Sequence, residues 1–396
     1  MTPRLFTGLA VAAAGSLVLA ALVHASADSW VTGTATGAKL FPSFKSDVAR
    51  TQSVTLKQGA QSIVLERTGE AWSVKDRGGF PVQGSKVGQL LAKLEAAELV
   101  GAKTRNPERF ALLELEDPNA KDAKSRYLSI ADDKGRTIAE VIVGKRSTEQ
   151  FGAGKGGTYV RRPGANETWL VNAEIDVNPA VNQWADTTIF ESEIATVARV
   201  TSEAPDQPKL VVEREAGKPA NKDGYKLAGM PDDKKLKYDY ALEDIVNAFA
   251  RVEFEDVRKA PADVSAPLSV AVFEADNGLK ISVRVKSEGD ARWATIEATA
   301  PAIETKAVEA KPAAEAKPEP AAADAKPDGT KPPDANKDEA KKDEVKPAEA
   351  KPDPKIAAKT AADKINARVA GWQFRLPSWK YDQLFKKQAD LLDAKG

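Results

Sequence analysis

The stretch "GWQFRLPSWKYDQL" (Gly371–Leu384) decides the fold, because it places aromatic residues after a long run that has no aromatic residue at all. Trp372, Phe374 and Leu376 alternate with polar residues, which is the pattern of a half-buried β-strand. The sequence before the run ends in another strand-like segment, residues 291–300. We therefore predict that these two segments pair, and that the run between them is an insertion rather than a tail.

The predicted insertion spans residues 301–361 and consists mainly of Ala, Lys, Pro, Glu and Asp. Such a composition buries too little apolar area to offset the conformational entropy of ordering, so we predict a disordered segment. Closing a loop of this length adds only about 2 to 3 kcal/mol over a tight turn, because the cost rises with the logarithm of length. Two interpretations stay open: an expansion without a partner, or a tether that reaches through the cell envelope.

Two parts of the chain show the same order of short strands, one helix and then hairpins. The first part alternates apolar and polar residues up to Val74, has apolar residues at helical spacing from Val87 to Leu94, and ends in hairpins over 126–173. The second part begins near Ala195 and repeats this order. In the second part, the insertion separates the two strands of the last predicted hairpin.

The sequence therefore predicts an α+β fold of two related repeats of antiparallel strands with one packed helix each, an N-terminal transmembrane helix and a long disordered insertion in the second repeat. A length of 396 residues suits more than one domain. The predicted boundaries are 1–27 for the export signal or transmembrane anchor, 38–190 for the first repeat, 301–361 for the insertion, and 191–300 plus 362–392 for the second repeat.

The N-terminus has the features of an export segment. Arg4 precedes an apolar run from Leu5 to Val23, and "ASA" at Ala25–Ala27 fits a cleavage site. Because the run is long enough to span a bilayer as a helix, we expect an uncleaved anchor. This predicts a single-pass protein of the bacterial inner membrane, held there by the N-terminal helix, with the bulk of the chain in the periplasm. The alternative is cleavage before Asp28 and a soluble periplasmic protein.

The composition argues against several classes of chemistry. The chain has no Cys, and its one His, His24, lies at the end of the export segment. Catalytic triads, Cys-His nucleophiles and Cys/His zinc sites therefore lack their residues. The 58 basic and 58 acidic side chains balance and are interspersed, so we expect no nucleic-acid partner. We predict a protein that is not an enzyme and needs no cofactor or metal.

Two patterns that resemble chemical motifs have simpler interpretations. Gly152, Gly154 and Gly157 match the spacing of a dinucleotide fingerprint, but a strand-like segment follows them instead of a helix, so we expect no nucleotide. Acidic residues gather at three places where a hydrolase would draw its carboxylates, although turns and solvated faces explain them as well. These groups are Asp132 and Asp133; Glu114, Glu116 and Asp117; and Glu253, Glu255 and Asp256.

The tryptophans provide the only candidate binding surface. Most of the seven occupy alternating strand positions and are best explained as core residues. Trp379 and Tyr381 are the exceptions, because they follow Pro377 beyond the last predicted strand. We predict an interaction surface at these two residues, and we assign no catalytic, cofactor-binding or metal-binding residue.

The order of several segments resembles the DUF4340 family, a bacterial domain of unknown function. The resemblance covers residues 40–190 and, less closely, the region up to Leu392. It implies a membrane-anchored envelope protein without assigned catalytic or binding residues, often encoded near ABC-transporter components. The segments that carry it are "LFPSF" (40–44), "SIVLERTGEAWSV" (62–74), "GGFPVQGSKVGQLLAKL" (78–94), "ERFALLELEDP" (108–118), "LSIADDKGRTIAEVIVGKR" (128–146), "GGTYVRR" (156–162) and "TWLV" (168–171).

Taken together, the sequence favours a non-enzymatic, membrane-anchored periplasmic protein that serves as an accessory or interaction module of an ABC-type transporter or another envelope assembly. One alternative is a secreted periplasmic module that binds a glycan or a lipid. A carboxylate-dependent hydrolase is the third interpretation. The sequence names neither the partner nor the ligand.

Overall fold

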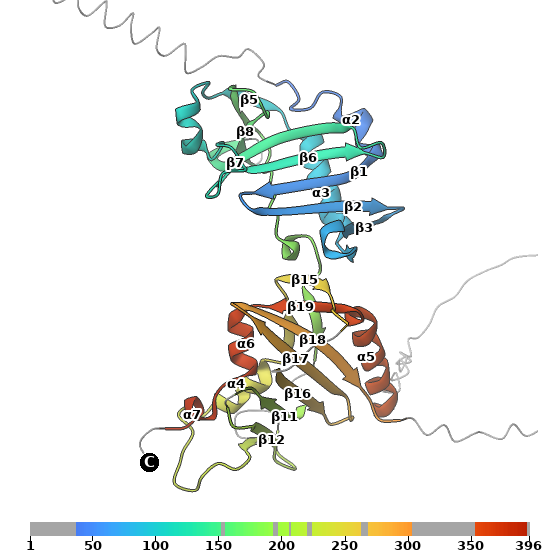
Figure 1. Ribbon diagram of the computed structural model, residues 1–396, viewed down its shortest axis with the longest axis vertical. Coiled ribbons are helices and arrows are strands. Elements are labelled where there is room, and N and C mark those ends of the chain that lie inside the picture. Colours follow the sequence, from blue (N-terminus) through green and yellow to red (C-terminus); the bar gives the residue numbers. More distant parts are fainter. Residues whose placement is uncertain are drawn as a thin grey trace, which may run out of the picture.

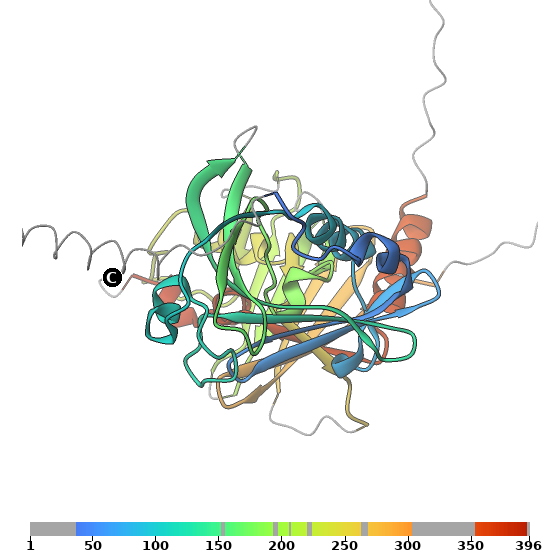
Figure 2. The same ribbon diagram turned by 90° about the horizontal axis from the view of Figure 1, so that it is seen from above.

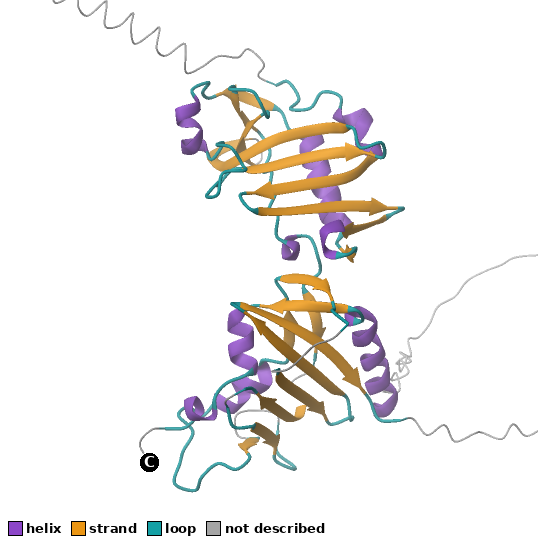
Figure 3. Ribbon diagram, in the orientation of Figure 1, coloured by secondary structure: helices purple, strands orange, loops and turns teal. Residues whose placement is uncertain are grey.

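Two large antiparallel sheets lie one above the other along the long axis of the molecule (Figure 1). The structure is a computed structural model that describes residues 37–151, 155–192, 197–205, 207–219, 224–262, 268–302 and 353–393. Strands dominate both halves, as Figure 3 shows by colour. Seen from above, the two halves overlie each other (Figure 2).

The first sheet has nine strands in the order β4-β3-β2-β1-β6-β7-β8-β9-β5. Helix α3 (Gly84–Ala96) covers one face of it, and short helical turns precede β1, join β3 to β4 and β5 to β6, and follow β9. The strands are β1 (Thr51–Gln58), β2 (Gln61–Thr68), β3 (Ala71–Val74), β4 (Phe80–Pro81), β5 (Leu99–Ala102), β6 (Arg126–Asp132), β7 (Thr137–Phe151), β8 (Lys155–Arg161) and β9 (Thr168–Val171). The helical turns are α2 (Phe44–Asp47), η1 (Val48–Arg50), η2 (Lys75–Arg77), η3 (Pro107–Leu113) and η4 (Val181–Gln183).

The second sheet has eight strands in the order β13-β12-β11-β16-β17-β18-β19-β15, and β10 pairs separately with β14. The strands are β10 (Thr188–Glu191), β11 (Val197–Glu203), β12 (Leu210–Arg214), β13 (Tyr225–Leu227), β14 (Arg251–Glu253), β15 (Asp256–Lys259), β16 (Ser269–Ala275), β17 (Lys280–Glu288), β18 (Ala291–Thr299) and β19 (Trp372–Leu376). The helices are α4 (Ala241–Asn247), α5 (Pro354–Val369), α6 (Ser378–Leu384) and α7 (Gln388–Leu391).

The two sheets share one strand order. From β3, the first sheet runs β3-β2-β1-β6-β7-β8-β9-β5, and from β13 the second runs β13-β12-β11-β16-β17-β18-β19-β15. In each sheet a helix precedes the last strand in this order: α3 comes before β5, and α4 comes before β15. Four strands that are consecutive in the chain, β6 to β9 and β16 to β19, form a meander. The chain from Ala300 to Gly371 therefore connects β18 to β19 at the place where a short loop connects β8 to β9.

Alternating apolar residues form the cores, as the sequence pattern indicates. In β17, Ile281, Val283 and Val285 are buried and the two residues between them are only partly covered. Helix α3 buries Val87, Leu90 and Leu94 on one face, which confirms the predicted helical spacing. One continuous cluster of buried side chains extends through both halves of the molecule.

The predicted pairing across the insertion is confirmed. β19 pairs antiparallel with β18, with Ala294 opposite Phe374, and on its other edge it pairs with β15, with Val257 opposite Phe374. Phe374 is completely buried between these two neighbours. Residues that follow the long insertion thus form an interior strand of the second sheet.

Aromatic rings join the two sheets. Phe80, on the edge strand β4 of the first sheet, meets three rings of the second half edge-on. The ring centroids lie 5.5 Å from Phe254, 5.0 Å from Trp372 and 6.1 Å from Phe374. Edge-to-face pairs at these separations add stability beyond the area they bury. Strand β19, which pairs with β18 and β15 in the second sheet, therefore also contacts the first sheet.

A charged pair borders this aromatic contact. Arg77 Nε lies 2.8 Å from Asp256 Oδ1, and Arg77 Nη2 lies 3.2 Å from Asp256 Oδ2. The two contacts form a bidentate ion pair between the two halves of the molecule. The hydrogen bond that Arg77 donates to Asp256 raises the pKa of Arg77, although partial burial acts in the opposite direction. Nearby, the Lys259 ammonium lies 3.5 Å from the centre of the Trp372 ring. Charge and aromatic surface thus reinforce the same junction.

The prediction of one packed helix in each repeat is wrong, and so is the end of the predicted disordered insertion. The second half carries α4, α5, α6 and α7, and α5 begins at Pro354, inside the predicted range 301–361. Asp353 caps α5 by accepting a hydrogen bond from the Lys355 amide, and Ala358 and Ala362 are buried. Because alanine carries little apolar area, its burial left no clear signal in the sequence. Residues 303–352 of the predicted insertion lie outside the described residues.

The predicted transmembrane helix is contradicted as well. Within the described ranges, no helix has the length and apolar character needed to cross a bilayer. The longest, α5, has 16 residues and includes charged side chains such as Lys359 and Asp363, whereas a span needs about 20 mainly apolar residues. This finding also contradicts the predicted single-pass location in the inner membrane. The predicted span at residues 5–23 lies outside the described residues.

The β6–β7 hairpin depends on one carboxylate. Asp132 Oδ1 accepts hydrogen bonds from the Lys134 and Arg136 amides at 3.0 and 2.9 Å, and Oδ2 accepts one from Arg136 Nε at 2.9 Å. The Asp132 side chain is fully buried. Burial alone would raise the pKa of Asp132, but these hydrogen bonds outweigh it and lower the pKa.

The substitution Asp132→Asn should therefore destabilise the protein in a pH-dependent way. A carboxylate with a lower pKa in the folded state contributes stability above its unfolded pKa, and this contribution is lost as the pH falls through the folded pKa. Urea unfolding should show a wild-type advantage near pH 7 that shrinks below about pH 4. An advantage of equal size at pH 7 and pH 3 would contradict this role of the charge.

Candidate functional site

Helix α6 carries both residues of the predicted interaction surface, but it places them differently. Trp379 is 55% exposed, the most exposed tryptophan side chain in the described ranges. Tyr381 is half-buried: its hydroxyl lies 2.9 Å from Ser269 Oγ, and its ring centre lies 4.7 Å from that of Phe385. Trp379 is therefore free to contact another molecule, whereas Tyr381 mainly fixes α6 on the second sheet.

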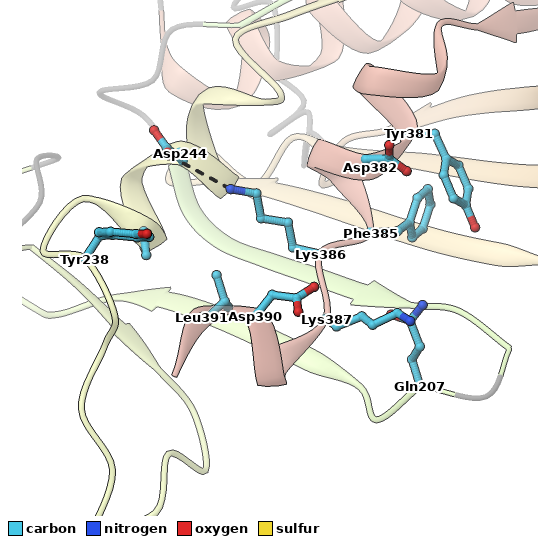
Figure 4. Close-up of a pocket in the computed structure, with 11 residues that line it drawn as sticks. Gln207, Tyr238, Asp244, Tyr381, Asp382, Phe385, Lys386, Lys387, Asp390 and Leu391 are labelled. Atoms are coloured by element: carbon cyan, nitrogen blue, oxygen red, sulfur yellow. Dashed lines mark ion pairs between the residues drawn. The ribbon is translucent and has the colours of Figure 1, made fainter. Parts of the chain in front are cut away.

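A cavity of about 450 Å³ lies between α4, α6 and α7. Figure 4 shows its lining: the ring of Phe385 and the side chain of Leu391 lie beside charged groups from all three helices and the segments that join them. Lys386 and Asp244 face each other across it, with Nζ and Oδ2 3.9 Å apart. Tyr238 stands on the α4 side. The cavity thus combines apolar surface with charges of both signs.

Two exposed tyrosines stand at the entrance on the α4 side. Tyr238 and Tyr240 are 49% and 52% exposed, and their rings stack with centroids 5.6 Å apart at an angle of 14°. The Lys237 ammonium lies 5.5 Å from the centre of the Tyr238 ring. The pair therefore offers exposed aromatic surface beside a positive charge.

A second hollow, of about 390 Å³, lies on the other side of α6. Trp379, Lys380 and Gln383 of α6 line it, and Arg251 and Glu253 of β14 lie opposite. The two hollows share Asp244 and Lys386. Helix α6 is therefore a ridge between two hollows, and we call the surface formed by α4, α6 and α7 the α6 face.

Lys380 fixes the base of this ridge. Its side chain is almost fully buried, and its Nζ donates a hydrogen bond to the Ala248 carbonyl at 3.0 Å. Burial lowers the pKa of Lys380, while the charge of Glu253 acts in the opposite direction. The ammonium also lies 4.9 Å from the centre of the Trp379 ring. A buried cation beneath an exposed tryptophan holds that ring in place by a cation–π contact.

The structure does not bring the three acidic groups of the sequence together. Each group has its own structural partners within the described residues. Asp132 organises a hairpin, Glu116 accepts hydrogen bonds from the Lys124 and Ser125 amides, and Asp256 pairs with Arg77. Across the described ranges, no three His, Cys, Asp or Glu side chains are placed to hold a metal ion.

The end of the glycine motif belongs to a strand that pairs with β7. Gly157 belongs to β8, so a strand follows the motif, as the sequence suggested. Gly152 and Gly154 lie outside the described residues. A dinucleotide fingerprint requires a helix whose N-terminus faces the phosphates, and β8 supplies none.

Sequence reasoning missed most residues of the α6 face. The Tyr238–Tyr240 pair gave a local signal, two tyrosines two positions apart next to Lys237, in a polar stretch before a helix. Lys380 gave none, because a lysine between Trp379 and Tyr381 reads as solvated. Its burial depends on Ala248, which lies 132 residues earlier in the chain.

A comparison of the chain with known protein families gives one match. The family model described as "Domain of unknown function (DUF4340)" matches residues 72–270, half of the chain. The chain belongs to the DUF4340 family. The match runs from β3 into β16 and so includes parts of both sheets. No curated protein and no solved structure matches the chain.

The substitution Lys380→Met tests the buried ammonium. A lysine whose pKa is lower in the folded state binds fewer protons when folded, so the wild-type protein should gain stability relative to Lys380→Met as the pH rises from 7 toward about 10. Chemical unfolding at several pH values measures this difference. Lys387→Met, at an exposed position beside the cavity between α4, α6 and α7, should show no such trend. A difference for Lys380→Met that is flat or falls with pH would refute the assignment.

Proposed function

We propose that this DUF4340 protein is a non-enzymatic interaction module that binds a protein partner through the α6 face. The observation that carries the proposal is the exposure of Trp379 above the buried Lys380. Tryptophans are enriched among the residues that dominate binding energy at protein interfaces. A ring that is already held in place loses little conformational entropy on binding.

The shape of the α6 face favours a protein over a small molecule. Two shallow hollows flank the ridge, so a partner would contact Trp379, the ridge and the Tyr238–Tyr240 pair together. Charges of both signs border the hollows, among them Asp244 and Lys386. Aromatic anchors inside a charged border are the usual composition of a protein interface.

The partner class comes from the family resemblance. The resemblance implies a role beside ABC-type transporters, and we propose that a protein subunit of such a transporter is the partner. The absence of an enzymatic role is likewise part of the proposal. It is supported by the structural use of Asp132, Glu116 and Asp256 and by the lack of His and Cys after His24.

A glycan-binding role is the second candidate. The stacked rings of Tyr238 and Tyr240 favour it, because a sugar ring packs well on a flat, exposed aromatic face. Under this alternative, soluble oligosaccharides would bind the purified protein, and Tyr240→Ala would weaken that binding more than Trp379→Ala.

Photo-crosslinking in cells that make the full chain tests the main proposal. A benzophenone amino acid at Gln383, which lines the same hollow as Trp379, should give a discrete adduct that mass spectrometry identifies as a transporter subunit. Trp379→Ala should reduce the yield about tenfold or more, as expected for a residue that dominates an interface.

The matched control is Leu112→Ala, which removes a 67% exposed apolar side chain from the first half and should leave the yield unchanged. Both variants should unfold at the wild-type denaturant concentration, because both side chains are exposed. No discrete adduct, or an undiminished adduct in Trp379→Ala, would contradict the proposal.

A further inference from the structure

A polar cavity of about 370 Å³ lies on the first sheet, on the face opposite the main core. Its floor is a single row of residues across four neighbouring strands. Lys57 of β1 is paired with Tyr127 of β6, Tyr127 with Ile142 of β7, and Ile142 with Arg161 of β8. All four line the cavity, and the segment around Asp117 closes it from above. Directly paired residues on one face of a sheet are neighbours, so the row is fixed by strand register.

Arg161 is the unusual member of this row. Its side chain is buried, with the residue only 9% exposed, and its guanidinium lies 4.6 Å from the centre of the Phe110 ring. Nε donates to the Leu115 carbonyl at 3.1 Å, and Nη1 donates to the Ala165 carbonyl at 3.0 Å. Within the described residues, Nη2 has no hydrogen-bond partner and no carboxylate lies within ion-pair distance of the guanidinium.

A buried guanidinium without an ion pair is an expensive arrangement. Removing a charge from water carries a large free-energy cost, which a well-placed counter-charge can offset. Burial accordingly lowers the pKa of Arg161, with only the more distant Asp117 acting in the opposite direction. Two carbonyls and a ring hold the group in a fixed orientation, but they do not neutralise it. An anion in the adjoining cavity would supply the counter-charge.

We propose that this cavity binds a small organic carboxylate, with the carboxylate on Arg161 Nη2 and the remainder of the ligand lying over Ile142 toward Lys57. Lys57 supplies a second positive charge at the far end of the row. The apolar Ile142 side chain between the two cations suits a short carbon skeleton. The cavity is distinct from the α6 face, which lies in the other half of the molecule.

The walls favour a carboxylate over a phosphate. Phosphate sites usually present several backbone amides that converge on the ligand, often at a helix N-terminus. Here Pro118 and Pro163 contribute no amide donor, and the Asn119 amide already donates to Asp117 Oδ1 at 2.9 Å. A single free guanidinium nitrogen with one nearby ammonium suits a planar, singly charged group.

Isothermal titration of the full chain with succinate, glucuronate and inorganic phosphate tests the proposal. At least one of the two organic acids should bind with measurable heat, and phosphate should bind at least about tenfold more weakly or not at all. Arg161→Met should weaken carboxylate binding about tenfold or more, as expected for the loss of a charge-assisted hydrogen bond.

Two further variants keep the test decisive if Arg161→Met fails to fold, because both alter the edge of the cavity only. Lys57→Met should weaken binding about two- to fivefold, whereas Asp117→Asn should tighten it by a similar factor by removing a competing negative charge. Lys45→Met, an exposed lysine outside the cavity, should change nothing. Absence of binding by both organic acids, equal binding of phosphate, or identical affinities in Lys57→Met and Asp117→Asn would overturn the proposal.

Discussion

The burial of Phe374 between two strands is the constraint on which the rest of the structure depends. On one side it faces Ala294 of β18, on the other Val257 of β15, and its ring contacts Phe80 of the first sheet. One side chain therefore takes part in closing the second sheet and in joining the two halves. The α6 face follows directly, because α6 begins two residues after β19 ends.

Local patterns allowed much of the fold to be predicted. The alternation in β17 and the helical spacing in α3 are short-range signals, and the aromatic alternation of Trp372 and Phe374 was strong enough to place β19 beside β18 across the insertion. The first two turns of helix α5 were missed because Ala358 is the buried residue there, and the composition argument assigns alanine-rich sequence to disorder. The error shows that an Ala-rich segment next to a folded strand can pack even where its average hydrophobicity is low.

The binding surfaces were harder to predict, because each depends on contacts far apart in the sequence. Trp379 could be identified by its position after Pro377, but the buried charge beneath it could not. The Arg161 cavity exists only because four strands align Lys57, Tyr127, Ile142 and Arg161 in register. The two proposed surfaces, one for a protein partner and one for a small anion, thus lie on sheets that share one strand order.

Hydrogen exchange of β19 in the full chain tests the central claim most directly. If β19 is an interior strand, its amides at residues 373–376 should exchange as slowly as those of β17 at residues 281–285, since both strands have neighbours on both sides. The two segments should also lose protection at the same denaturant concentration. Rapid exchange of residues 373–376 while β17 stays protected would show that the segment after the insertion does not close the sheet.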